Sequence, residues 1–302
     1  NAAAIYRGLA GLCKAFRPQV VHTHRKKENV LGALAARRHG ARSLRTVHGW
    51  TEFPDLGLAL HKRLSRFTDV ASGRYLQDRV VAVSDDLRAK LEGVFGARRL
   101  AVVENGVNLA AIREAGRVPA ALPGATDRRR IGIIARLVPV KRHDRFVDAA
   151  TALLAGGRDD VEFYIAGDGP EAAAMAARIA ASGHEARIHA LGFCNDALAV
   201  TAALDAVVVC SDHEGIPMNV LEAAALGVPV VTVPLPSIAG ILDSGAPGLV
   251  AGDDSPAALA VALAAVLDGG LPEKPALDDT WRYSARTMAA GYDALYRAVL
   301  AG

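Results

Sequence analysis

Two carboxylates in one short stretch give the chain its strongest local chemical signal. Glu214 and Glu222 bracket the sequence Glu-Gly-Ile-Pro-Met-Asn-Val-Leu-Glu, which follows an apolar run and the loop Ser-Asp-His. Pro217 favours the first turn of a helix, so we expect Glu214 in the loop and Glu222 in the first helical turns. Carboxylates repel a phosphate group but accept hydrogen bonds from hydroxyl groups. We therefore expect the two acids to bind the hydroxyl groups of a sugar or a ribose. Taken alone, the pair fits better an exposed loop acid and an acid favoured by the helix dipole.

Two cations follow an earlier apolar run, at 131–134, in the sequence Arg-Leu-Val-Pro-Val-Lys. Arg136 contributes a permanently charged fork and Lys141 a flexible ammonium group, a combination that suits a diphosphate. A solvated loop with a lysine at a helix start is the alternative. A cation at a helix N-terminus opposes the helix dipole, however, and therefore favours a bound anion.

Short apolar runs alternate with helical patterns along the whole chain. This alternation predicts parallel sheets built from right-handed crossovers, with ligands at the carboxyl edge of the sheet. The expected strands lie at 20–21, 43–47, 80–83, 100–103, 131–134, 161–166, 187–191, 206–210 and 228–233, and the expected helices include 28–38, 87–95, 143–155, 170–182 and 280–300.

The length and composition indicate two globular domains. The 302 residues are 51% hydrophobic and 22% charged, and no apolar run approaches the length of about 20 residues needed to cross a membrane. The pattern lapses between 116 and 130, so we expect domains at 1–122 and 123–280 and a terminal helix at 281–302. The three cysteines match neither a disulfide framework nor a zinc site, which indicates a reducing, cytoplasmic setting.

Charge is distributed unevenly between the two halves. Residues 1–120 contain 21 Lys/Arg and 10 Asp/Glu, whereas residues 121–302 contain 14 and 22. A basic first half fits contact with anionic lipid, another polyanion or phosphate, and it fits solvated surface helices equally well.

The motifs together resemble the family 4 (group 1) retaining glycosyltransferases, which have the GT-B architecture. The resemblance spans nearly the whole chain and rests on Arg136-Leu-x-x-x-Lys141, the turn 167–170, Leu-Gly-Phe at 191–193, and the Glu214-x7-Glu222 motif that continues into Gly-Val-Pro-Val. First-domain landmarks are Val-His-Thr-His at 21–24, Thr-Val-His-Gly at 46–49, Val-Ser at 83–84 and Asn-Gly-Val-Asn at 105–108. The implied fold is α/β, with two Rossmann-like doubly wound domains facing across a cleft.

The resemblance also implies roles for individual residues. Arg136 and Lys141 would hold the donor diphosphate, Glu214 the sugar hydroxyls and Glu222 the ribose hydroxyls, with no metal or other cofactor required. His48 would approach the transferred sugar, whereas a histidine bonded at a strand end is the simpler interpretation. Further donor contacts would come from Phe193, Cys194, Gly215, Ile216, Met218, Asn219 and Val220. The terminal helix would pack on the first domain through Tyr292 and Tyr296.

Two departures from the family pattern limit these implications. The segment Pro-Leu-Pro-Ser-Ile-Ala-Gly at 234–240 lacks the usual paired glycines, and the family normally begins with additional strand–helix units. We therefore expect the first domain to be truncated, lacking its N-terminal segment.

The resulting hypothesis is a retaining transferase that uses a UDP- or GDP-sugar and a lipid-linked or saccharide acceptor in glycolipid or cell-envelope polysaccharide synthesis. A nucleotide-sugar epimerase and a non-catalytic binding module are the alternatives. Nucleic acid is not an expected partner. Peripheral contact with the anionic inner membrane face, through Arg25, Lys26 and Lys27, is an additional expectation.

Overall fold

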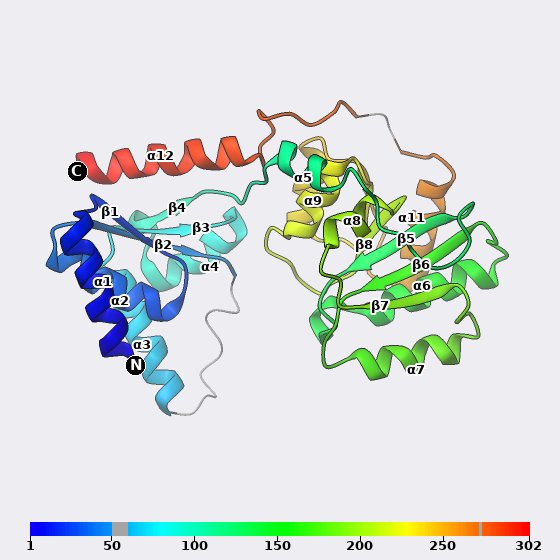
Figure 1. Ribbon diagram of the computed structural model, residues 1–302, viewed down its shortest axis with the longest axis horizontal. Coiled ribbons are helices and arrows are strands. Elements are labelled where there is room, and N and C mark those ends of the chain that lie inside the picture. The colour runs from blue at the N-terminus through cyan, green and yellow to red at the C-terminus, as the bar shows by residue number, and fades with distance from the viewer. Residues whose placement is uncertain (50–59, 272–273) are drawn as a thin grey trace. The chain divides into compact units, whose positions relative to one another are not determined.

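The computed structural model describes residues 1–49, 60–271 and 274–302 (Figure 1). The chain forms two compact units. Unit 1 contains Asn1–Asn105 and Met288–Gly302, and unit 2 contains Gly106–Thr287. The segment 106–122, expected in the first domain, has its contacts in unit 2, where helix α5 (Leu109–Ala115) packs against α9 (Met218–Leu226).

Unit 1 is built on a four-stranded parallel sheet in the order β1-β2-β3-β4. Its strands are β1 (Val20–Thr23), β2 (Arg42–Val47), β3 (Arg79–Ala82) and β4 (Leu100–Val102). Its helices are α1 (Ala2–Phe16), α2 (Lys26–Arg38), α3 (Leu60–Tyr75), α4 (Asp85–Phe95) and most of α12 (Ala285–Ala301), with a short 3-10 turn at Ala97–Arg99.

The two faces of the unit 1 sheet have different coverings because side chains alternate along each strand. Leu44 and Val81 meet α12 on one face, together with the partly buried rings of Tyr292 and Tyr296. The other face, which includes Val47, packs against α4. The terminal helix therefore completes the hydrophobic core of unit 1, although it is the last element of the chain.

A buried ion pair lies beneath the second face of this sheet. The Arg45 side chain is fully buried and donates to Asp69 over 2.9 Å, to Ser72 over 3.0 Å and to Gln77. Burial of a charge is costly unless hydrogen bonds replace its water shell, and these partners provide that replacement.

Unit 2 contains a six-stranded parallel sheet in the order β10-β9-β8-β5-β6-β7. Its strands are β5 (Arg129–Ile134), β6 (Val161–Ala166), β7 (Ile188–Gly192), β8 (Ala206–Val209), β9 (Val230–Thr232) and β10 (Gly248–Val250). Besides α5 and α9, its helices are α6 (His143–Ala155), α7 (Ala172–Ser182), α8 (Ala197–Ala202), α10 (Pro236–Asp243) and α11 (Pro256–Leu267), with a 3-10 turn at Pro139–Lys141.

Helices cover both faces of the unit 2 sheet. Helix α6 contacts both α7 and α11, and α5, α8 and α9 form a second group (Figure 1). Strands β6 and β8 are buried at every position, as expected for parallel strands covered on both faces. Each sheet thus lies in an α/β layer arrangement, as the alternating pattern predicted.

The expected strands appear close to their predicted positions, with one exception in length. The β-branched run 228–233 yields a strand of three residues, Val230–Thr232. None of the helices in the described ranges combines the length and the hydropathy that crossing a bilayer would demand.

Candidate functional site

The topology of unit 2 brings two particular loops together. The chain runs from β5 outward to β6 and β7, then returns to the other side of β5 to form β8, β9 and β10. The carboxyl ends of β5 and β8 are therefore adjacent at the point where the strand order reverses. Doubly wound sheets bind their ligands at such a point. The loops that follow these two strands carry the cations and the first acid predicted from the sequence.

Lys141 and Glu214 make direct contact across this reversal point. Lys141 Nζ donates to Glu214 Oε1 over 2.5 Å, and Ser211 Oγ donates to the same oxygen over 2.6 Å. The two charged side chains are only 21% and 11% exposed. At this low exposure the attraction is screened less than on an open surface. One predicted cation and one predicted acid are thus brought together.

The loop after β6 supports the loop that carries Arg136. Gly167 has φ of 147°, and a Cβ there would lie 1.9 Å from the Ala135 carbonyl oxygen. A Cβ on Gly169 would lie 2.3 Å from the Leu137 oxygen. Only glycine permits this close backbone approach. Asp168 accepts the Gly169 N–H over 2.7 Å, which agrees with its interpretation as a turn residue.

Arg136 and Glu222 differ from Lys141 and Glu214, because their side chains have no hydrogen-bond or ion-pair partner among the described residues. Arg136 is exposed, and within residues 1–49, 60–271 and 274–302 its side chain makes no hydrogen bond or ion pair. Glu222 lies on α9, is half-buried, and likewise lacks a hydrogen-bond partner among the described residues. Burial raises the pKa of the Glu222 carboxyl because desolvation penalises its charged form. Both groups retain their hydrogen-bonding capacity for a ligand.

The residues between Glu214 and Glu222 differ in how far they are buried. Asn219 Nδ2 donates to the Ile134 carbonyl at the end of β5 over 2.9 Å, which ties α9 to that strand. Met218 and Gly215 are exposed, whereas the side chains of Ile216 and Val220 are buried in the core. Any ligand contact of these two buried residues must therefore come from the backbone.

Phe193 and Cys194 follow β7 at the same edge of the sheet. Phe193 is 74% exposed, an unusual position for a large aromatic side chain. Desolvation raises the pKa of the Cys194 thiol. Phe193 therefore offers a free aromatic face, and Cys194 a protonated thiol. Cys210 is fully buried at the end of β8, where it packs as a small apolar residue.

In unit 1 the carboxyl edge of the sheet collects imidazole and hydroxyl groups. His48 follows β2, and its Nε2 lies 3.1 Å from Nδ1 of His24, which follows β1. His22 Nδ1 contacts the Tyr296 hydroxyl at 2.7 Å, and its Nε2 contacts Thr46 Oγ1 at 2.8 Å. Thr46 Oγ1 also lies 2.9 Å from the Tyr292 hydroxyl.

Two of these imidazoles, those of His22 and His48, have lowered pKa values. Burial, followed by the neighbouring imidazoles of His24 and His48, lowers the pKa of His22 to about 4. Desolvation also lowers the pKa of His48. The bonds of His22 to Tyr296 and Thr46 give this residue a structural role, because they connect β1, β2 and α12. The contact of His48 with a sugar, which the family resemblance implies, stays a prediction.

Two contributors to the site were not predicted from the sequence. Ser211 donates to Glu214 Oε1, and Ser237 at the start of α10 donates to the Glu214 carbonyl over 3.2 Å. Ser211 directly follows an apolar run and precedes Glu214 by three positions, a spacing that could have indicated it. Ser237 comes from a distant loop, and only the fold places it beside Glu214.

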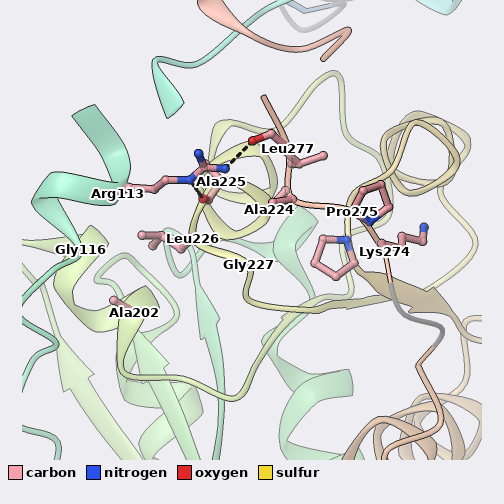
Figure 2. A pocket seen from close by; sticks show the side chains of 12 residues that line it. Arg113, Gly116, Ala202, Ala224, Ala225, Leu226, Gly227, Lys274, Pro275 and Leu277 are labelled. Carbon is pink, nitrogen blue, oxygen red and sulfur yellow. Dashed lines mark hydrogen bonds between the residues drawn. The ribbon is translucent and has the colours of Figure 1, made fainter. Parts of the chain in front are cut away.

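Two hollows in unit 2 lie at opposite edges of the sheet. One, of about 370 Å³, is lined by Ser211, Asp212 and the loops after β9 and β10, at the carboxyl edge. The other, of about 520 Å³, lies where α8 and α9 end before β8 and β9 begin (Figure 2).

The cations of the second hollow bind helix ends. Arg113 donates to the carbonyls of Ala225 over 3.0 Å and Leu277 over 2.6 Å (Figure 2). Lys274 donates to two carbonyls at the end of α10. Each cation thereby binds one carbonyl near a helix C-terminus, Ala225 of α9 or Leu242 of α10, and one carbonyl outside the helices. None of the predicted site residues lines either hollow, although Ser211 and Asp212 of the first belong to the loop that carries Glu214.

Comparison with protein families gives two matches that together span most of the chain. The family described as "Glycosyltransferase Family 4" matches residues 1–111, and the family described as "Glycosyl transferases group 1" matches residues 128–269. The boundary between the matches lies close to the boundary between units 1 and 2.

Two curated relatives show the extent of the sequence similarity. The chain is 25% identical over 233 residues to an Escherichia coli UDP-Gal:alpha-D-GlcNAc-diphosphoundecaprenol alpha-1,3-galactosyltransferase, which covers 73% of this chain and 59% of the relative. It is 28% identical over 271 residues to a Geodermatophilus obscurus D-inositol 3-phosphate glycosyltransferase, with 82% and 59% covered. The chain therefore spans less than two thirds of the length of these relatives.

Solved structures share the fold. A glycosyltransferase from Rickettsia africae superposes with a TM-score of 0.71 at 18% identity, over 98% of this chain and 80% of that one. Anabaena HepE in complex with UDP superposes with a TM-score of 0.69 at 19% identity, over 99% and 78%. With its two parallel-sheet units and both family matches, the chain belongs to the family 4, group 1 glycosyltransferases of GT-B fold.

Proposed function

We propose that this chain supplies the donor site and the acceptor side of a retaining glycosyltransferase that moves a sugar from a UDP- or GDP-sugar to a hydroxyl group. The observation that carries this proposal is the Lys141–Glu214 contact at the reversal point of the unit 2 sheet. It places a cation and a hydroxyl-binding acid where a doubly wound sheet receives its ligand.

The chemistry follows from the charge of each group. Breaking the bond between the sugar and the diphosphate develops negative charge on the phosphate oxygens. Lys141 would stabilise that charge from a partly buried position, where a preorganised cation contributes most. The exposed Arg136, whose side chain makes no ion pair among the described residues, would add to this stabilisation without a metal ion. Once Lys141 turns to the phosphate, the Glu214 carboxylate is free to accept hydrogen bonds from the sugar hydroxyls. Glu222, which lacks a partner among the described residues, would accept from the ribose.

Unit 1 offers a different kind of binding surface. Neutral imidazoles such as His48 both donate and accept hydrogen bonds, which suits hydroxyl groups of a sugar or of an acceptor. His48 would accordingly contact the transferred sugar. The basic character of this half of the chain leaves a saccharide acceptor and a lipid-linked acceptor both open.

The relatives favour a UDP-sugar as the first donor to test. The E. coli relative is named for UDP-Gal and for a diphosphoundecaprenol-linked acceptor, and the HepE structure contains UDP. A lipid-linked acceptor in cell-envelope polysaccharide synthesis is therefore the more specific proposal.

A nucleotide screen followed by product analysis tests the proposal. Calorimetry with UDP, GDP and ADP should detect one preferred nucleotide, and NMR of the product should show the donor's anomeric configuration retained. Inversion of the anomer would contradict the retaining mechanism. Formation of a free epimeric sugar without acceptor would indicate an epimerase, and binding without turnover under any acceptor would indicate a binding module.

We also propose that unit 1 contacts anionic lipid headgroups. Arg25 and Lys27 are exposed at the start of α2, and large apolar side chains are exposed on the two helices beside it, Ile5 of α1 at 44% and Phe67 of α3 at 69%. Exposed apolar groups combined with cations are typical of proteins that bind at a membrane interface.

Vesicle sedimentation at low salt tests this contact. Vesicles with anionic lipid should sediment the wild-type chain, and neutralising Arg25, Lys26 and Lys27 should release it. A matched variant that neutralises Arg88, Lys90 and Arg98 should stay bound. Equal binding of both variants would contradict the proposal.

A further inference from the structure

Arg142, the residue that follows Lys141, has an unusual backbone conformation. Its φ of 51° and ψ of 48° lie in the left-handed region, which residues with a Cβ rarely occupy. Among the described residues other than glycine, only Arg17 shares this feature, with φ of 49°. Arg17 lies at the end of α1 in unit 1 and is exposed. The two arginines therefore have the same backbone conformation in two different settings.

The side chain of Arg142, unlike that of Arg17, is tied on two sides. Its Nη2 and Nε donate to Asp144 over 2.8 and 3.0 Å, and its Nη1 donates to Asp212 over 3.0 Å. The bonds to Asp144, followed by those to Asp212, raise the pKa of the Arg142 guanidinium. Asp212 belongs to the loop after β8 that also carries Ser211 and Glu214. The guanidinium thus links the loop of Lys141 to the loop of Glu214.

Asp212 is itself anchored from a third direction. Its Oδ1 lies 3.0 Å from Nη1 of Arg145, a buried residue of α6. Arg145 also donates to the Cys210 carbonyl over 3.1 Å and to Asp254 over 2.6 Å. The Asp212 carboxylate therefore accepts a hydrogen bond from the loop after β5 and forms an ion pair with the helix that follows that loop.

Backbone and thiol contacts reinforce the same link. The Asp212 N–H donates to the Val140 carbonyl over 2.9 Å, and Cys210 Sγ contacts the Arg142 carbonyl at 3.0 Å. Val140 and Arg142 are the immediate neighbours of Lys141. The backbone on both sides of Lys141 is thus attached to the loop that carries Glu214.

We propose that Arg142 and Asp212 are positioning residues that hold Lys141 in place for the donor diphosphate. The inference rests on the proposed function, in which Lys141 binds that diphosphate. Lysine has a flexible side chain with many rotamers, so a fixed backbone is the means by which its ammonium group can be preorganised. Both carboxylate partners of Arg142 neutralise its charge, which leaves Arg142 a supporting part and Lys141 the contacting cation.

Glycine substitution at the two left-handed arginines tests the proposal. Arg142→Gly and Arg17→Gly both place glycine at a left-handed position, which glycine adopts without strain. Only Arg142→Gly removes a contact with Asp212 in the loop that carries Glu214. We expect Arg142→Gly to lower donor turnover by roughly tenfold to a hundredfold, mainly in kcat, since misplacement of a catalytic group by about 1 Å has effects of that size. Arg17→Gly should turn over donor as the wild type does.

Two further variants separate positioning from a general loss of structure. Asp212→Asn leaves the backbone of residue 142 unchanged and should produce a similar deficit, and the double variant should be no worse than either single one. Arg142→Lys retains the charge without the fork and should recover part of the lost turnover. Full additivity of the two single variants would contradict a shared link.

Amide hydrogen exchange of the full chain without ligand provides a readout that is independent of activity. Exchange in segments 136–142 and 211–216 should be faster in Arg142→Gly than in Arg17→Gly. Unchanged exchange, or wild-type turnover of Arg142→Gly, would overturn the positioning role. If the wild type binds no nucleoside diphosphate, the proposed function fails, and the exchange measurement still decides whether the link holds the two loops.

Discussion

The carboxyl edges of the two sheets are built alike but carry opposite chemistry. In unit 1, β1 and β2 lead into His24 and His48, and the neighbouring hydroxyls are those of Thr46 and two tyrosines. In unit 2, β5 and β8 lead into Lys141 and Glu214. The first edge collects neutral hydrogen-bonding groups and the second collects charges.

The difference shows what a parallel sheet does and does not determine. Converging strand ends create a place where side chains from separate loops can meet. Whether that place suits a hydroxyl or a phosphate depends on the side chains. Desolvation keeps His22 and His48 uncharged in unit 1, whereas mutual pairing offsets the desolvation of Lys141 and Glu214 in unit 2.

Replacement of Lys141 should have the largest effect, because it removes the cation from the charged carboxyl edge of the unit 2 sheet. Lys141→Met removes the ammonium group that balances Glu214 and would face the diphosphate. We expect donor turnover to fall by about 100- to 1,000-fold, the usual effect of removing one preorganised electrostatic group. Lys90→Ala, which breaks an exposed ion pair of α4 with Asp86, is the control and should be normal. Near-normal turnover of Lys141→Met would rule out its assigned role.

Glu222→Gln should separate function from stability in unit 2. The raised pKa of Glu222 means that its charged form is disfavoured in the folded state, so its contribution to stability decreases as pH rises above 4.5. Removing the charge should therefore raise Tm at pH 7, while nucleotide affinity falls by roughly tenfold through a lost charged hydrogen bond to the ribose.

The exposed Glu185→Gln variant is the control for this prediction, and neither quantity should change in it. Calorimetry and thermal unfolding provide the measurements. A lower Tm for Glu222→Gln would show that the carboxylate has a structural partner.

The neutral histidine of the unit 1 sheet, His22, predicts that the stability of the protein depends on pH. Above pH 6.5 His22 is neutral in the folded and the unfolded chain. As pH falls from 6.5 to about 4, the imidazole is protonated in the unfolded chain but stays neutral in the folded chain. Protonation therefore stabilises the unfolded state, and the free energy of unfolding decreases. Buried His143 of unit 2, with its pKa also lowered to about 4 by burial, adds to the same loss.

Thermal unfolding between pH 4 and 7 should therefore show a smaller decline in His22→Gln than in the wild type. His213→Gln, at an exposed residue of the loop after β8, should follow the wild-type curve. An unchanged curve for His22→Gln would mean that the imidazole is not held neutral by its surroundings.

Tyr296→Phe should have the smallest effect and tests how α12 joins the sheet of unit 1. The substitution removes the hydroxyl that contacts His22 Nδ1 at 2.7 Å. We expect a loss of about 0.5–1.5 kcal/mol in unfolding free energy, the net value of one hydrogen bond. Tyr75→Phe, at a residue that is 71% exposed, should be neutral in the same denaturant titration. An equal loss in both variants would show that the hydrogen bond between Tyr296 of α12 and His22 does not stabilise the protein.

Much of the fold was predictable because its signals are local. Apolar runs such as 161–166 and 206–210 became strands β6 and β8, and Pro217 precedes the first residue of α9. The short helices α5 and α8 were not singled out, since tertiary packing rather than a long periodic pattern stabilises them. Helix α3 was also not singled out, although it spans 16 residues. The pattern also placed segment 106–122 with the first half, whereas its contacts are with α9 and other parts of unit 2.

The sequence alone determined the alternation of strands and helices, the motif residues and the contrast in charge between the halves, because each depends on residue type and on spacing within one segment. Tertiary structure alone decided that Lys141 meets Glu214, that Arg142 is tied to Asp212, and that α12 completes the core of unit 1. These contacts join residues 70 or more positions apart, and the strand order that brings them together is a property of the assembled sheets.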